Sequence, residues 1–202
     1  DTWLWDIETN STANPVAVYT TTGDDPDQGW TVHSMVLNGT WGDHRTYTSD
    51  YELKHSRIIQ DGPNMRGTFA MAIAPVYTYA AFVELIPADG EDPARQELKV
   101  IRLEVRNASA SWEDFGNSTA FAGCTNPGYI SMDIDEEGRP WVLFIDEATG
   151  DIHVYYLGPA QTWTSVAVSV SDISTNPWYF YGYANDMNGT DIKLIGTTPV
   201  IS

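Results

Sequence analysis

Apolar and polar residues alternate along most of this chain with a period of two, which is typical of strands that bury at least one face in a sheet. The clearest stretch runs from residue 128 to 170. It contains four segments rich in Val, Ile, Tyr, Phe and Trp, at 129–135, 140–146, 151–157 and 162–170. Short turns separate them, two ending in Gly138 and Gly150 and the third containing Pro159. The stretch predicts a four-stranded antiparallel sheet.

The same order of strands and turns recurs along the chain, with Trp at the start of the fourth strand. The full units are expected at about 1–48, 68–116 and 128–170, and a partial unit at about 176–202. Val32 precedes Trp41 by nine residues, and Val154 precedes Trp163 by the same nine. Because one such sheet cannot cover both of its faces, the units must stack on one another. The pattern predicts an all-β, β-propeller-like array with three full four-stranded blades and part of a fourth.

Acidic residues outnumber basic residues by 28 to 10, which gives a formal net charge of −18 at pH 7. This charge argues against a nucleic-acid partner, which requires a basic surface. It is also unfavourable for contact with anionic lipid. No apolar run is long enough for a transmembrane helix, so membrane insertion is not expected.

Five N-x-S/T sequons favour a secreted glycoprotein. Their asparagines are Asn10, Asn38, Asn107, Asn117 and Asn188, and each falls in an expected turn or loop. The alternative interpretation is that Asn, Gly, Ser and Thr are simply common in turns. Cys124 is the only cysteine, so no internal disulfide is expected.

Residues 133–163 read DIDEEGRPWVLFIDEATGDIHVYYLGPAQTW. This pattern resembles the blades of secreted lectin-like and sialidase-like β-propellers. The resemblance implies a ring of roughly five to eight blades, which a longer chain, a second copy or a partner chain would complete unless the ring is a small one. The sequence departs from the binding-site motifs of these families at two places. Arg139 lies at the edge of its strand, where fucose-binding lectins have an Arg within the strand, and Trp141 follows Gly138 without completing a sialidase Asp-box.

Aromatic residues are the main candidates for ligand contacts, because flat rings stack on the apolar face of a sugar at low entropy cost. The candidate ligand-binding residues are Trp41, Trp112, Trp163, Trp178, Tyr181 and Arg139. The first three recur at one place in the repeat, where packing between blades is the alternative interpretation. The segment that contains Trp178 and Tyr181 is dense in aromatic residues, and strand geometry would place them on both faces.

No catalytic residue is assigned from the sequence. The chain has no G-x-S-x-G motif and no phosphate-binding glycine loop, and its four His residues lack the spacing of a zinc site. No cofactor is expected, with Ca²⁺ as the alternative, because acidic residues are dense at 24–27 and 133–138. Neither segment has the spacing of a Ca²⁺-binding loop.

Together these features favour a secreted, non-enzymatic protein that binds a glycan or another protein through a β-propeller surface. Two other classes stay open. One is a structural subunit of an extracellular or viral assembly, with copies or a partner chain completing the ring. The other is a propeller-fold glycoside hydrolase, which would need two carboxylates on facing strands.

Overall fold

The fold is known from a computed structural model, which describes residues 2–9, 14–21, 30–38, 40–53, 69–104, 107, 109–115, 121, 124–146, 148–149, 151–167 and 192–201. The regular elements in these ranges are β-strands, joined in antiparallel sheets. The described part of the chain has no helix of the length and apolarity that crossing a membrane would require. The predicted all-β class is confirmed.

The first sheet is a four-stranded meander in the order β1-β2-β3-β4. Its strands are β1 (Thr2–Thr9), β2 (Pro15–Thr21), β3 (Thr31–Asn38) and β4 (Thr40–Thr48). Alternation along β2 and β3 places Val16, Val18 and Val32 in a core shared with the second sheet. It leaves the side chains of Tyr19 and His33 on the opposite face of the first sheet.

The second sheet is built around its longest strands, β7 and β8. Its strands are β5 (Glu52–Leu53), β6 (Phe69–Ile73), β7 (Tyr77–Ile86), β8 (Arg95–Glu104) and β9 (Glu113–Asp114). Both β5 and β6 pair with the same edge of β7, one after the other along its length. The fourth strand predicted from Trp112 onward is reduced to the two residues of β9, which pair with Ile101 and Arg102.

The third sheet has the order β10-β11-β12-β13, and a separate hairpin lies beside it. The strands are β10 (Pro127–Ile134), β11 (Pro140–Asp146), β12 (Asp151–Leu157), β13 (Trp163–Val166), β14 (Ile192–Ile195) and β15 (Thr198–Ile201). Side chains of β10 hold the hairpin: Ile192 N donates to Ser131 Oγ at 3.2 Å and Leu194 N to Asp133 Oδ2 at 2.8 Å. The strand predicted around Trp178 lies outside the described residues.

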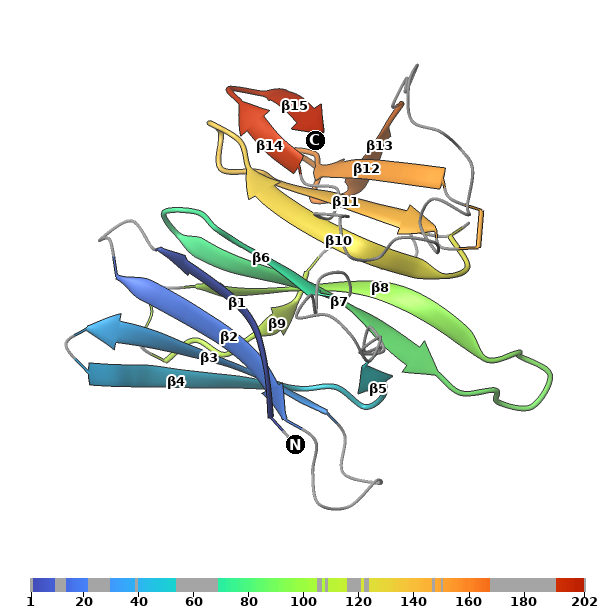
Figure 1. Cartoon of the computed structure of the whole chain (residues 1–202), viewed down its shortest axis with the longest axis horizontal. Coiled ribbons are helices and arrows are strands. Elements are labelled where there is room, and N and C mark those ends of the chain that lie inside the picture. The colour runs from blue at the N-terminus through green and yellow to red at the C-terminus, as the bar shows by residue number, and fades with distance from the viewer. Residues whose placement is uncertain are drawn as a thin grey trace, which may run out of the picture.

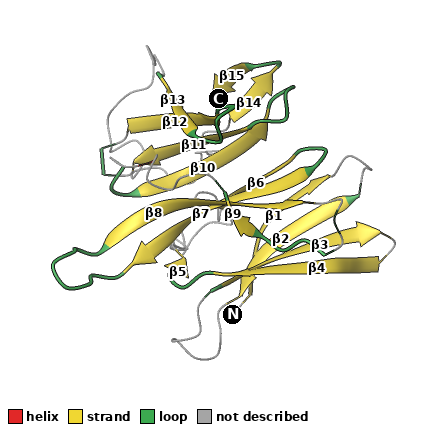
Figure 2. Cartoon of the chain, turned by 180° about the vertical axis from the view of Figure 1, so that it is seen from behind, coloured by secondary structure: helices red, strands yellow, loops and turns green. Residues whose placement is uncertain are grey.

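The sheets are stacked in chain order, and the hairpin covers the outer side of the third (Figures 1 and 2). Their first strands are neighbours, since β1 contacts β6, β6 contacts β10 and β10 contacts β14. The second sheet is buried on both faces. In β7, Ala80 and Phe82 pack toward the first sheet, whereas Tyr79, Ala81 and Val83 pack toward the third. The described strands form several antiparallel sheets but no closed barrel.

One buried carboxylate in β7 makes the stability of the fold depend on pH. Glu84 is 5% exposed and accepts a hydrogen bond from Ser49 Oγ at 2.6 Å. Burial raises the pKa of Glu84 and outweighs the opposing effect of the Ser49 hydrogen bond. The folded state therefore keeps a proton that the unfolded state has already lost, so this group lowers stability as the pH rises above the ordinary carboxyl value.

Replacing Glu84 with Gln is expected to increase the free energy of unfolding at neutral pH, because the amide keeps an acceptor for Ser49 without a buried charge. Urea unfolding from pH 4 to pH 8, with the wild-type chain as reference, measures the effect. The gain should grow with pH and then level off. A gain of the same size at every pH would contradict the assignment.

Candidate functional site

A cleft of about 520 Å³ lies between the second and third sheets. Three segments from the same end of the stack line it: the turn between β6 and β7, the turn between β10 and β11, and the turn between β12 and β13. Strand residues also reach it, among them Tyr79 of β7 and Arg102 of β8. Such a volume is within the range of small-molecule sites, so we take this cleft as the candidate site.

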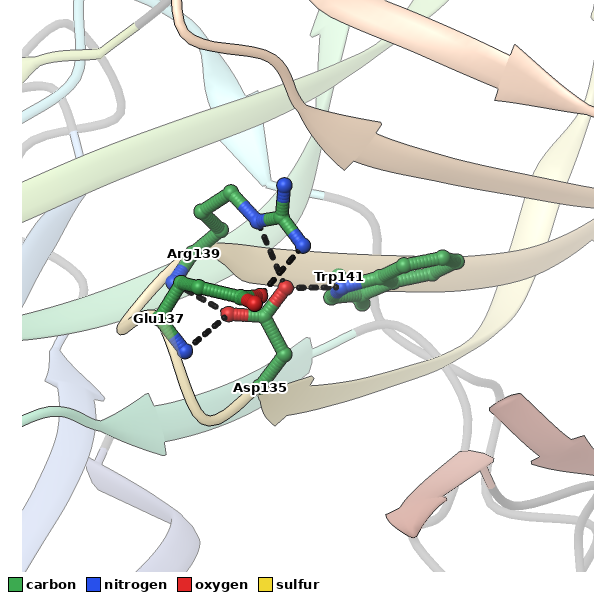
Figure 3. A network of polar contacts seen from close by, with 4 residues as sticks. All are labelled: Asp135, Glu137, Arg139 and Trp141. Atoms are coloured by element: carbon green, nitrogen blue, oxygen red, sulfur yellow. Dashed lines mark hydrogen bonds and ion pairs between the residues drawn. The ribbon is translucent and has the colours of Figure 1, made fainter. Parts of the chain in front are cut away.

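The β10–β11 turn is built on the buried carboxylate of Asp135, whose side chain is 0% exposed. It accepts hydrogen bonds from the backbone N of Glu137 at 3.1 Å, from Arg139 N at 2.8 Å and Nε at 2.7 Å, and from Trp141 Nε1 at 3.0 Å (Figure 3). Gly138 has a φ of 78°, which a residue with a side chain rarely adopts. The sequence Asp-x-x-Gly-Arg-x-Trp therefore folds locally into a rigid turn.

The same contacts determine the charge of Asp135. Burial alone would raise its pKa, but the hydrogen bonds from Trp141 and Arg139, together with the charge of Arg139, outweigh that effect and hold the pKa below its ordinary value. Asp135 is therefore ionised at neutral pH, with its oxygens occupied by donors of the protein. It is a structural anion and is poorly suited to act as a general acid or a nucleophile.

Two arginines reach the cleft from opposite sheets, and both are held in the same manner. Arg102 Nε donates to Glu113 at 2.6 Å, and its guanidinium lies 4.7 Å from the Tyr77 ring and 4.1 Å from the Phe115 ring. Arg139 Nε donates to Asp135, its Nη2 donates to Glu137, and its guanidinium lies 5.5 Å from the ring of Tyr156.

This arrangement leaves donors for a ligand. Among the side chains of the described residues, Arg102 donates only through its Nε, to Glu113, so both Nη groups are available to the cleft. Arg139 uses Nε and Nη2 and leaves Nη1. Carboxylates neutralise both cations, so the cleft offers directional hydrogen bonds and aromatic surface without an excess of positive charge.

The aromatic rings beneath Arg102 belong to the wall of the cleft. Tyr79 packs on Phe115 at 5.3 Å and on Tyr77 at 6.1 Å between ring centroids. Burial raises the pKa of Tyr79 to about 12, so its phenol stays protonated. Tyr77 is partly exposed at the edge of the cleft, where a ligand can contact it.

The structure places the predicted ligand-binding residues in different surroundings. Arg139 lies in the cleft. Trp112 and Trp163 are 6% and 7% exposed, and each packs in the core that its own sheet shares with the preceding sheet. This packing accounts for their recurrence in the repeat. Trp41 lies in β4 opposite Leu37, and Trp178 and Tyr181 are outside the described residues.

Sequence reasoning missed Tyr77, Phe115 and Arg102. For Arg102 a signal was present. Leu98 and Val100 occupy the face of β8 that packs on the third sheet, and Arg102 continues the same parity. A single Arg on an otherwise apolar strand face indicates that this part of the strand lies at the edge of the hydrophobic core, where the side chain can reach solvent or a cleft.

No metal-ligand set of three or more His, Cys, Asp or Glu residues is present in the described part of the chain. Of the two acidic segments considered for Ca²⁺, 24–27 lies outside it. In the other, Asp133 accepts from Ile134 N and Leu194 N, both at 2.8 Å, and Asp135 is engaged as described. The Ca²⁺ alternative stays a prediction.

The structure describes the asparagines of two of the five sequons, Asn38 and Asn107. Asn107 is exposed, and its Oδ1 accepts a hydrogen bond from Ser109 N at 3.0 Å. Asn38 is the last residue of β3. Asn10, Asn117 and Asn188 lie outside the described residues, so glycan attachment stays a prediction.

The chain matches no protein-family model, and no curated protein is significantly similar to it. The resemblance of residues 133–163 to propeller lectins therefore stays a prediction. The case for a function rests on the cleft and its side chains.

Proposed function

We propose that this chain is a secreted, non-enzymatic glycan-binding protein of β-propeller type, and that the cleft between the second and third sheets holds a neutral sugar. The propeller part of the proposal is supported by the order of the sheets. The first and third sheets are four-stranded meanders, and the three sheets stack with their edge strands β1, β6 and β10 adjacent, which is how blades follow one another around a propeller axis.

The observation that carries the sugar assignment is the pair of anchored arginines. Sugar hydroxyls accept and donate hydrogen bonds, and the free Nη groups of Arg102 and Arg139 supply donors whose positions are fixed by Glu113 and Asp135. Tyr77 adds an aromatic surface for the apolar face of the ring. Because these side chains are held before a ligand arrives, little rotamer entropy is lost on binding.

The electrostatic balance favours a neutral saccharide over an acidic one. The cleft that the two arginines line is also lined by Asp135, Glu136 and Glu137, and the chain as a whole carries a net charge of −18. An anionic ligand would therefore approach an unfavourable field. Hydrolysis is not proposed, because Asp135 is fully engaged and Glu137 is paired with Arg139.

Substituting Lys for Arg102 is expected to weaken glycan binding at least about tenfold, because the charge remains but the planar fork of donors is lost. A glycan array of neutral oligosaccharides identifies the ligand, and isothermal titration calorimetry then measures its affinity for each variant.

Arg95→Lys is the matched control. Arg95 also donates through Nε to a carboxylate, that of Glu97, at 2.6 Å, but it does not line the cleft. Its replacement should leave affinity unchanged. An array without any bound glycan, or equal affinities for wild type and Arg102→Lys, would refute the assignment, and release of shorter sugars from the bound glycan would favour the hydrolase alternative.

A further inference from the structure

Four side chains with metal-binding atoms gather on the outer face of the first sheet, the face turned away from the second sheet. They are Tyr19 of β2, His33 and Met35 of β3, and His44 of β4. Three adjacent strands supply them, so the sheet itself fixes their spacing. This face is separate from the glycan cleft, and the inference does not depend on the proposed function.

The two imidazoles lie edge to edge. Their planes are within 3° of parallel, their centroids are 5.0 Å apart, and His33 Nδ1 is 2.8 Å from His44 Nε2. The centroid distance is close to the nitrogen separation plus the two ring radii, so the rings share one plane and are not stacked face to face. The two nitrogens therefore point at each other and share one proton.

The surroundings keep the Nδ1 lone pair of His33 available. Thr21 Oγ1 lies 2.7 Å from His33 Nε2. In the tautomer that donates from Nε2 to Thr21, the proton is absent from Nδ1, and the threonine holds the ring in place. Such a hydrogen bond is what commonly orients a metal-binding histidine.

The separation of the two nitrogens, 2.8 Å, equals the distance between adjacent ligand atoms in a square-planar metal site. Two ligands at a right angle around an ion, each with a bond of about 2.0 Å, are about 2.8 Å apart. Square-planar or tetragonal coordination is typical of Cu²⁺, which is also the divalent ion that imidazole sites bind most tightly. Tyr19 Oη lies 3.4 Å from His44 Nε2, and Met35 Sδ lies 3.6 Å from Tyr19 Oη, so further donors are close.

We propose that His33 Nδ1 and His44 Nε2 form a surface site for a single Cu²⁺ ion, with the Tyr19 hydroxyl beside it. The exposed ring of His44 turns so that its Nε2 lone pair and the Nδ1 lone pair of His33 converge on the ion, and the proton that the two rings share moves to Nδ1 of His44. The net charge of −18 raises the local concentration of cations.

Titration of the full chain with Cu²⁺ at pH 7.5, followed by calorimetry and electron paramagnetic resonance, tests the site. One equivalent should bind, with hyperfine splitting from two nitrogens. His44→Gln and His33→Gln should each lower the affinity at least about tenfold and remove one nitrogen from the spectrum. His44 is exposed, so its replacement is not expected to affect folding, which thermal unfolding verifies.

His153→Gln is the matched control, because His153 lies on the third sheet beside Phe144. The affinity of the His153→Gln variant for Cu²⁺ should equal that of the wild type. Excess Mg²⁺ in every titration occupies the many surface carboxylates. Wild-type affinity in His44→Gln, or a spectrum with oxygen ligands only, would overturn the proposal and identify the binding as adventitious association with acidic residues.

Discussion

Replacing Trp163 with Ala is expected to lower the free energy of unfolding by about 3–5 kcal/mol, because it removes a large buried ring and leaves a cavity between two sheets. Trp163 is 7% exposed, and its ring centroid lies 5.3 Å from that of Phe121. It belongs to the core that joins the second and third sheets, which is also the interface that forms the cleft. Urea unfolding at pH 7 measures the loss.

Trp163→Phe separates packing from ligand binding. The indole Nε1 is buried and has no hydrogen-bond partner among the described residues, so phenylalanine forfeits no hydrogen bond, and we expect a loss of only about 1–2 kcal/mol. Because the ring is buried, glycan affinity measured well below the unfolding transition should equal that of wild type. A tenfold weaker affinity in this variant would instead assign Trp163 to the ligand.

Replacing Asp135 with Ala is expected to lower the free energy of unfolding by about 2–4 kcal/mol, because it leaves the indole of Trp141 and the backbone N–H groups of the turn without their acceptor. The loss should be accompanied by weaker glycan binding, because Arg139 is no longer held at the cleft. Urea unfolding and calorimetry with the array-selected glycan measure the two effects.

Glu137→Ala is the control for this prediction. Glu137 pairs with the same arginine but is 55% exposed, so we expect a change of only about 0.5 kcal/mol. The difference between the wild type and Asp135→Ala should also depend on pH. Because the pKa of Asp135 is lowered in the folded state, its contribution is present above the ordinary carboxyl pKa and is lost as the pH falls through the folded-state value. Equal losses in both variants would contradict the assigned role of Asp135.

The strands could be predicted where local chemistry determines them. The bounds of β11 and β12 agree with the predicted 140–146 and 151–157, because alternation and the Gly138 turn are local signals. The fourth strand of the second unit was predicted too long. Trp112 packs into the core, and Phe115 N donates to Val100 O at 3.0 Å just after β9. Tertiary packing thus overrides strand propensity there.

The candidate site was less predictable, because its residues meet only in three dimensions. Arg139 was identified, but its counterpart Arg102 comes from a different sheet, and no sequence spacing relates the two. The His33–His44 pair was missed for a similar reason. The metal motifs sought in the sequence are short and local, whereas these residues face each other across paired strands, where a register shift between Ser34 and Val36 adjusts their alignment.

The order in which the sheets stack has a consequence for local unfolding. When each layer contacts only its neighbours, the stability of the stack is close to a sum of nearest-neighbour terms, and opening begins at the ends. Among the described layers, the second sheet has a partner on both faces, whereas the first sheet has one on a single face. Fluctuations of the first sheet therefore expose its amide groups to exchange without disturbing the cleft between the second and third sheets.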